Sequence, residues 1–193
     1  MRTVLLFLST FVFCINIFSQ PKNLINIEKE YQKQYAQLLL DTTNVYCHKE
    51  LRIFNNLSGM TNVGILVSQY VNGIEVYFFL DSAMLIYRNG QIANISAFDN
   101  IGTPIFTRWY DRNGDLRYDW RYTYTGTLPY QENKRASKRA LECYVRNYKN
   151  GVLKNEGLTV GGKKEGLHVT YDKRGNVKSK IVYSKGKAIK QLD

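Results

Sequence analysis

This 193-residue chain has few of the side chains on which metal and nucleophilic sites depend. It contains two histidines, His48 and His168; His48 adjoins Cys47, but no second Cys/His pair follows at zinc-site spacing. A Gly-x-Ser-x-Gly nucleophile elbow and a glycine-rich phosphate loop are both absent. We therefore expect a protein that is not an enzyme and that holds neither a metal nor a cofactor.

Long apolar runs are scarce as well, and the only one stands at the start of the chain. An uncharged run from Thr3 to Phe18 follows Arg2 and precedes Ser19, which is the pattern of a secretory signal peptide. We expect cleavage near Ser19 and an exported product that is periplasmic, outer-membrane-associated or extracellular. An uncleaved membrane anchor is the alternative, although a bilayer span needs about 20 apolar residues.

Cysteine is the third scarce residue. Cys47 and Cys143 remain after removal of the expected signal peptide. An oxidising compartment would permit a disulfide between them. Two unpaired thiols are the alternative, because only the distance between the two residues decides.

Positive charge is abundant, but only in the last third of the chain. Residues 20–132 hold 10 Lys/Arg against 11 Asp/Glu, whereas residues 133–190 hold 16 Lys/Arg against four acids. Such segregation favours an anionic partner, which outside a cell means headgroups, acidic polysaccharide or an acidic protein rather than nucleic acid. A solvated lysine face that keeps strands from pairing is the alternative.

Glycine recurs with a period in the second half of the chain. Gly90, Gly114, Gly151 and Gly175 are separated by 24, 37 and 24 residues, and an apolar residue follows two positions after each. The spacing predicts a repeat array interrupted by a 13-residue insertion. An Asn-Gly pair at 72–73 between apolar runs adds a further hairpin.

The region before the strands predicts a helix. Over residues 24–41 the apolar side chains recur every three or four positions and lie on one face. We therefore expect a mainly β protein, an antiparallel β-hairpin meander with one N-terminal amphipathic helix packed on its sheet, and so α+β overall.

One expected strand, Leu116–Thr125, alternates regularly between apolar and polar residues, which places four aromatic residues on one face. This face is either a binding platform on which sugars stack or the core beneath the N-terminal helix. The four residues are Tyr118, Trp120, Tyr122 and Tyr124.

The chain divides into five expected segments. A signal peptide (1–19) precedes the helix and first hairpin (20–80), degenerate β-hairpin repeats (81–127), a basic insertion (128–147) and two firmer repeats (148–193).

The firmer repeats carry a resemblance. The segment from Tyr148 to Gly157 reads Y-K-N-G-V-L-K-N-E-G, and G-G-K-K-E-G follows from Gly161. A looser copy runs from Tyr171 to Lys187. These residues resemble the MORN-repeat variant of exported bacterial proteins, in which a Y-x-N-G-x-L-K-x-E-G strand leads to a G-K-x-x-G turn. The resemblance implies stacked β-hairpins in one elongated sheet, and it implies no single function.

Three functions remain open. The first is a non-enzymatic binding or scaffold module of the cell envelope that associates peripherally with a membrane or binds a protein partner. The candidate binding residues are Lys163, Lys164, Lys178 and Lys180. The second is a polysaccharide-active enzyme within residues 20–100, which would need two carboxylates about 5–9 Å apart. Its candidates are Glu50, Glu75, Asp81 and Asp99. The third is an antitoxin-like or immunity-like partner.

Overall fold

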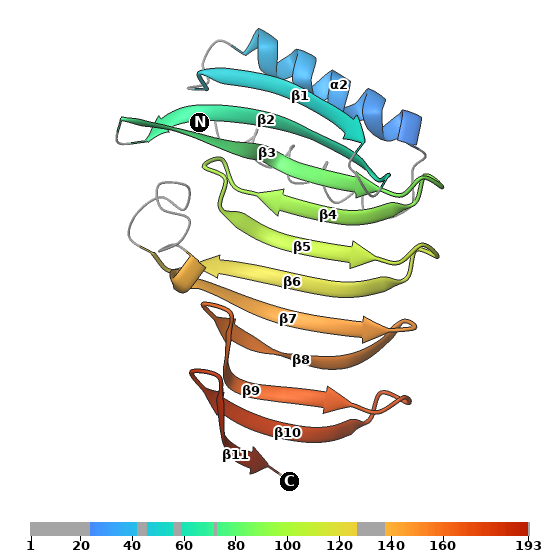
Figure 1. Ribbon diagram of the computed structural model, residues 1–193, viewed down its shortest axis with the longest axis vertical. Coiled ribbons are helices and arrows are strands. Elements are labelled where there is room, and N and C mark those ends of the chain that lie inside the picture. Colours follow the sequence, from blue (N-terminus) through green and yellow to red (C-terminus); the bar gives the residue numbers. More distant parts are fainter. Residues whose placement is uncertain (1–23, 42–45, 56–58, 72, 127–137, 193) are drawn as a thin grey trace, which may run out of the picture.

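A computed structural model describes residues 24–41, 46–55, 59–71, 73–126 and 138–192 of the chain. It forms one open antiparallel sheet of eleven strands with a helix at its N-terminal end (Figure 1). The order of strands in the sheet is their order in the sequence, so each strand pairs with its two chain neighbours. The expected hairpin meander is confirmed, and the expected signal peptide lies outside the described residues.

The elements are bounded as follows: α2 Leu24–Leu40, β1 His48–Asn55, β2 Thr61–Val71, β3 Ile74–Ile86, β4 Ile92–Phe98, β5 Pro104–Tyr110, β6 Leu116–Tyr124, the 3-10 helix Lys138–Ala140, β7 Leu141–Lys149, β8 Val152–Val160, β9 Lys163–Tyr171, β10 Val177–Ser184 and β11 Lys187–Leu192.

The periodic glycines lie in the turns that follow β3, β5, β7 and β9. All four have positive φ, at 82°, 90°, 71° and 85°, a conformation that L side chains rarely adopt. In a meander these turns fall at the same end of the sheet, which is the right-hand side in Figure 1. The 24-residue period is therefore the length of one hairpin, and the longer interval spans the β6–β7 connection.

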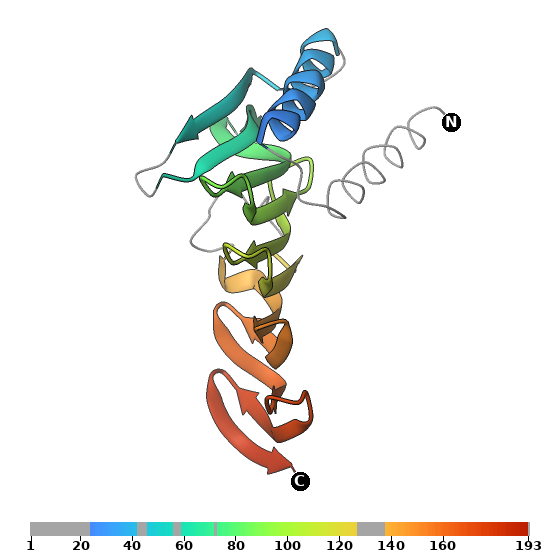
Figure 2. The same ribbon diagram turned by 90° about the vertical axis from the view of Figure 1, so that its right-hand side faces the viewer.

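The hydrophobic core occupies the N-terminal part of the sheet, where α2 packs on β1 and β2. Ile27 and Tyr31 of the helix are each 2 % exposed and contact Val63, Ile65 and Val67 within one cluster that continues through β3 and β4. Seen from the side, the helix stands at one end of a long, narrow sheet (Figure 2). The described part of the C-terminal half consists of a single layer.

Three expected boundaries need correction. Strand β1 was not predicted, and the division at residue 80 falls inside β3, next to a bulge at which Asp81 has φ 56°. The expected insertion at 128–147 is too long, because β7 begins at Leu141. Residues 128–137 lie outside the described part of the chain.

The disulfide alternative is wrong for this chain. Cys47 is exposed, Cys143 is buried, and both thiols are free. Cys47 pairs with β2 just before β1 begins, and five strands separate β1 from β7. At about 4.8 Å per strand the two residues lie roughly 25–30 Å apart, whereas a disulfide needs Cα atoms within about 7 Å.

Candidate functional site

The aromatic residues of β6 lie on the face of the sheet opposite α2. Phe106 and Tyr110 of β5 pack against the core, and Phe106 pairs across strands with Arg121, which places the polar residues of β6 on the helix side. Tyr118 and Trp120 therefore face away from the helix, which packs mainly on β1 and β2 and reaches β3 through the hydrogen bond between Tyr31 and Ser82. The interpretation of this face as core beneath the helix is wrong.

These aromatic residues form a half-exposed row joined to amide side chains. The rings of Tyr118 and Trp120 have centroids 5.6 Å apart, and Tyr118 is 42 % exposed. Trp120 Nε1 donates to Asn147 Oδ1 at 3.2 Å, and Asn147 Nδ2 donates to Asn155 Oδ1 at 2.6 Å. The two remaining tyrosines, Tyr122 and Tyr124, are partly buried farther along β6. This side of the sheet therefore presents the aromatic rings of β6 beside the side-chain amides of Asn147 and Asn155, which hydrogen bonds hold in place.

The helix-side face carries a row of alternating charges that the sequence did not reveal. Arg108 Nε donates to Asp119 Oδ1 at 3.1 Å, and the register places Arg146 directly opposite Asp119 on the next strand. Arg146 Nε lies 3.2 Å from Glu156 Oε2, and Tyr171 donates to the same carboxylate at 2.5 Å. The Asp119 side chain is 7 % exposed, so this row continues the core as paired charges.

The hydrogen bond between Tyr171 and Glu156 shifts the pKa of both groups. It is the largest cause that lowers the pKa of Glu156, and it raises the pKa of Tyr171 to about 12. The carboxylate is therefore ionised and the phenol protonated at neutral pH. The acidic and basic residues of this row form ion pairs and hydrogen bonds with one another, so none of them is placed to act as a free acid or base.

The four predicted lysines do not form one patch. Lys163 and Lys164 begin β9 beside the β10–β11 turn, where the Gly186 amide donates to the Lys164 carbonyl at 2.8 Å. Lys180 pairs with Val169 near the other end of β9, and Lys178 lies in the bulge beyond it. Along the strand the two pairs are on the order of 15 Å apart.

The second histidine is a buried residue of the sheet. His168 is 7 % exposed, its Nε2 donates to the Leu158 carbonyl at 2.7 Å, and its ring meets Tyr183 edge-on at 5.1 Å. Gly157 faces the imidazole so closely that a Cβ at this position would overlap the ring. Burial, followed by the positive charge of Lys164, lowers the pKa of His168.

This lowered pKa makes stability depend on pH. The unfolded chain binds a proton at His168 near pH 6.5, whereas the folded chain resists it, so the free energy of unfolding should decrease as the pH falls below about 6.5. The slope cannot exceed about 1.4 kcal/mol per pH unit for one group. Urea denaturation between about pH 7.5 and 5.5 measures it.

Two variants locate the effect. His168→Leu should flatten the pH dependence, whereas His48→Gln, at an exposed position, should retain it. An unchanged slope in His168→Leu would assign the dependence to another group.

Three of the four carboxylates considered for catalysis accept hydrogen bonds or form ion pairs with local groups, and burial raises the pKa of the fourth, Asp81. Glu50 pairs with His48 and Arg52, and Ser68 Oγ donates to Glu75 at 2.5 Å. Asp99 accepts the backbone N–H groups of residues 101 and 103 within the β4–β5 turn. Asp81 lies at the β3 bulge, and with Asp99 it contributes, after burial, to raising the pKa of Tyr46 to about 12.

The Asp-x-Asn-x-Asp segment at 111–115 forms the β5–β6 turn. Asp111 Oδ1 accepts the backbone N–H groups of Asn113 and Asp115 at 2.9 and 3.1 Å. The carboxylate therefore closes the turn. Within the described ranges no group of three or more His, Cys, Asp or Glu residues could hold a metal ion.

A pocket of about 530 Å³ lies at the end of the sheet that carries the glycine turns. None of the candidate site residues predicted from the sequence lines it, although Arg88, Asn89 and Arg112 lie in turns that the periodic glycines mark. Its lining comes from the β1–β2 connection and the turns after β3 and β5, namely Gly59, Met60, Tyr87, Arg88, Asn89 and Arg112.

In the described part of the chain no helix is both long and apolar enough to cross a membrane. No protein-family model, no curated protein and no solved structure matches the chain.

Proposed function

We propose that this chain is an exported, non-enzymatic binding module of the cell envelope that holds an anionic component of the envelope on the C-terminal half of its sheet. The observation that carries the proposal is uncompensated positive charge. Residues 138–192 contain 14 Lys/Arg and only four acids. Three of those acids, Glu156, Glu165 and Asp172, already accept hydrogen bonds from neighbouring groups.

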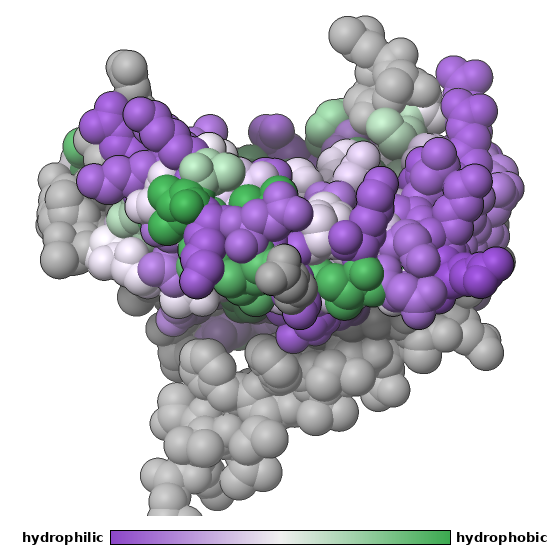
Figure 3. Space-filling view, turned by 90° about the horizontal axis from the view of Figure 1, so that it is seen from below, coloured by the Kyte–Doolittle hydropathy of each residue, from purple (hydrophilic) through white to green (hydrophobic). Residues whose placement is uncertain are grey.

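The arrangement of the basic residues supports a partner with repeated negative charges. Lys149, Lys173 and Arg174 are exposed in the turns after β7 and β9, at the same end of the sheet as Arg88 and Arg112. Turns two strands apart are separated by about 10 Å. Viewed from its C-terminal end, the molecule is largely hydrophilic, with smaller apolar areas between (Figure 3). Such spacing suits a charged polymer or a headgroup surface.

The two lysine pairs of β9 and β10 provide the test. We expect Lys163→Gln with Lys164→Gln, and separately Lys178→Gln with Lys180→Gln, to weaken binding to envelope fractions several-fold. All four together should weaken it about tenfold, because each exposed charge contributes a few tenths of a kcal/mol. A pull-down at low and at high salt measures this, and high salt should release the partner.

Lys29→Gln with Lys33→Gln is the matched control, because it removes two exposed positive charges from α2, at the other end of the molecule. Binding should be unchanged in this variant. Equal losses in the control, or binding that survives high salt, would overturn the proposal. Retention by a protein that does not depend on these lysines would instead favour the immunity-like alternative.

The resemblance to the MORN-repeat variant enters this proposal as support for a scaffold. Residues 148–190 cover the end of β7, all of β8 to β10 and most of β11 as paired strands, which suits a surface that a partner lies across. We do not propose the polysaccharide-active enzyme, because the contacts of Glu50, Glu75 and Asp99 already occupy those carboxylates.

A further inference from the structure

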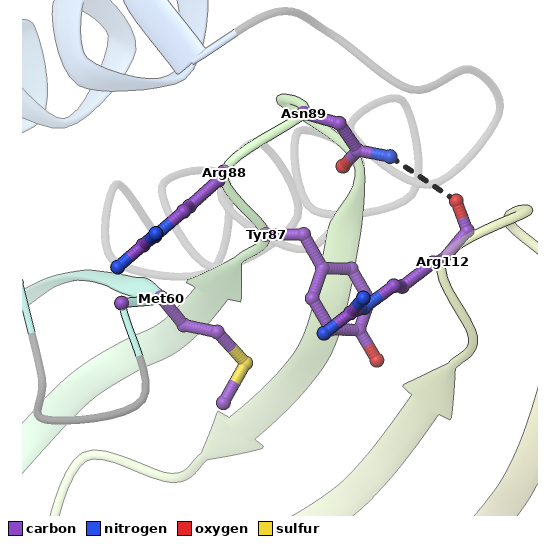
Figure 4. Close-up of a pocket in the computed structure, with 6 residues that line it drawn as sticks. Met60, Tyr87, Arg88, Asn89 and Arg112 are labelled. Atoms are coloured by element: carbon purple, nitrogen blue, oxygen red, sulfur yellow. Dashed lines mark hydrogen bonds between the residues drawn. The ribbon is translucent and has the colours of Figure 1, made fainter.

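We propose that the pocket between Arg88 and Arg112 binds a small organic anion through a phosphate or carboxylate group. This site lies in the part of the chain whose net charge is close to zero, and it includes none of the four lysines that test the proposed function. Both arginines line the pocket: Arg88 extends toward Met60, and Arg112 extends across the ring of Tyr87 (Figure 4).

Two hydrogen bonds hold the turns that carry the arginines in register. Tyr87 donates its hydroxyl to the Tyr110 carbonyl at 2.9 Å, and Asn89 Nδ2 donates to the Arg112 carbonyl at 3.2 Å. The other amide atom of Asn89, Oδ1, accepts the Gln91 N–H at 3.1 Å within its own turn. The positions from which the two arginines extend are thus set before any ligand arrives.

The side chain of Arg88 is positioned by the β1–β2 connection. Gly59 has φ 75°, and a Cβ there would overlap the Arg88 guanidinium, so the guanidinium lies directly on the glycine backbone. Only a glycine allows this contact. The β1–β2 connection, which forms one wall of the pocket, therefore orients the Arg88 guanidinium.

Neither guanidinium has an acidic partner among the described residues. No ion pair of that part of the chain includes Arg88 or Arg112, and none of the described residues that line the pocket is acidic. The nearby Asp111 is already engaged, because its carboxylate accepts two turn N–H groups and lies 3.9 Å from Arg117. Two cations that line one pocket, with no acidic partner among the described residues, favour a ligand that supplies negative charge.

The chemistry of the walls limits the ligand. Guanidinium groups bind phosphate and carboxylate through paired N–H···O bonds. The Tyr87 ring and the Met60 side chain offer an apolar surface for the body of the ligand. A volume of about 530 Å³ falls within the range of small-molecule sites.

The turn after β7 does not reproduce this site. The turn after β7 carries Lys149 where the turns after β3 and β5 carry arginine, and its Asn150 replaces Asn89. The turn after β7 also lies too far from Gly59 and Met60 for the β1–β2 connection to form a wall beside it. Lys149→Gln is therefore a matched control that removes one turn cation without touching the pocket.

Isothermal titration calorimetry of the full chain with inorganic phosphate and with citrate tests the proposal and distinguishes the two anion classes. We expect saturable binding of at least one probe at one site per chain. Arg88→Gln and Arg112→Gln should each weaken it about tenfold or more, because each removes a hydrogen bond between charged groups. Lys149→Gln should change the affinity less than about twofold.

Three outcomes would overturn the site. They are non-saturable binding of both probes, affinities that survive both arginine substitutions, and an equal loss in Lys149→Gln. Urea midpoints of all variants establish that they are folded. Arg112→Gln carries the test if Arg88→Gln loses stability through its contact with Gly59, because the Arg112 side chain is exposed.

Discussion

Replacement of Tyr31 by alanine should lower the free energy of unfolding by about 3–4 kcal/mol, the largest loss expected for a single substitution in this chain. Tyr31 is 2 % exposed at the centre of the contact between α2 and the sheet. Its hydroxyl and the Ser82 Oγ, which is also buried, lie 2.9 Å apart in a hydrogen bond. Alanine would leave a cavity and an unsatisfied serine at once.

Urea denaturation followed by circular dichroism measures this loss. Tyr31→Phe retains the ring and removes only the hydroxyl, so it should cost about 1–2 kcal/mol. Leu40→Ala, at a residue 82 % exposed in the same helix, should change stability by less than about 0.5 kcal/mol. Equal effects of Tyr31→Ala and Leu40→Ala would mean that the helix does not dock on the sheet through this residue.

Substitution of Gly157 by alanine should cost about 2–3 kcal/mol, although it adds only one methyl group. Gly157 pairs with His168 across β8 and β9, and the imidazole occupies the space that the methyl would need. The ring would have to move away from the Leu158 carbonyl and from Tyr183, and it would lose both contacts.

A double-mutant cycle separates this clash from a general effect of alanine on the strand. In a His168→Ala background the methyl group meets no ring, so Gly157→Ala should cost less than about 1 kcal/mol there. Urea midpoints of the four proteins give the coupling. Additive losses would show that the imidazole is not what excludes a side chain at residue 157.

Several elements of the fold could be predicted from local signals. The periodic glycines marked turns because a positive φ is a property of the backbone at one residue, and it needs no distant partner. Strand Leu116–Tyr124 was predicted nearly to its ends, because strict alternation of apolar and polar side chains has only one regular explanation. Helix Leu24–Leu40 followed from its apolar face in the same way.

Strand β1 gave no such signal. It lies at the edge of the sheet and pairs only with β2, and its last four residues are all exposed. Because little of it is buried, its sequence is not constrained to alternate. Strand β1 forms because it can pair with β2, and its own sequence carries no pattern that predicts a strand.

The candidate sites show the same division. Alternation placed Tyr118 and Trp120 on one face, but it could not say which face α2 would cover, because the helix packs mainly on β1 and β2, several strands away from β6. The position of Arg146 opposite Asp119 depends on the register of two strands that the insertion separates. The arginine pocket required Gly59, which lies 29 residues before Arg88 in the chain.

The sequence by itself determined the hairpin period, the turn positions, the helix and the concentration of positive charge in the last third of the chain. These properties are local or additive, so each can be read without knowledge of contacts. Only the tertiary structure decided which face is core, that Cys47 and Cys143 lie far apart, and that Arg88 and Arg112 line one pocket. Each of these depends on the distance between residues brought together by strand order and register, and that distance is a property of the folded chain.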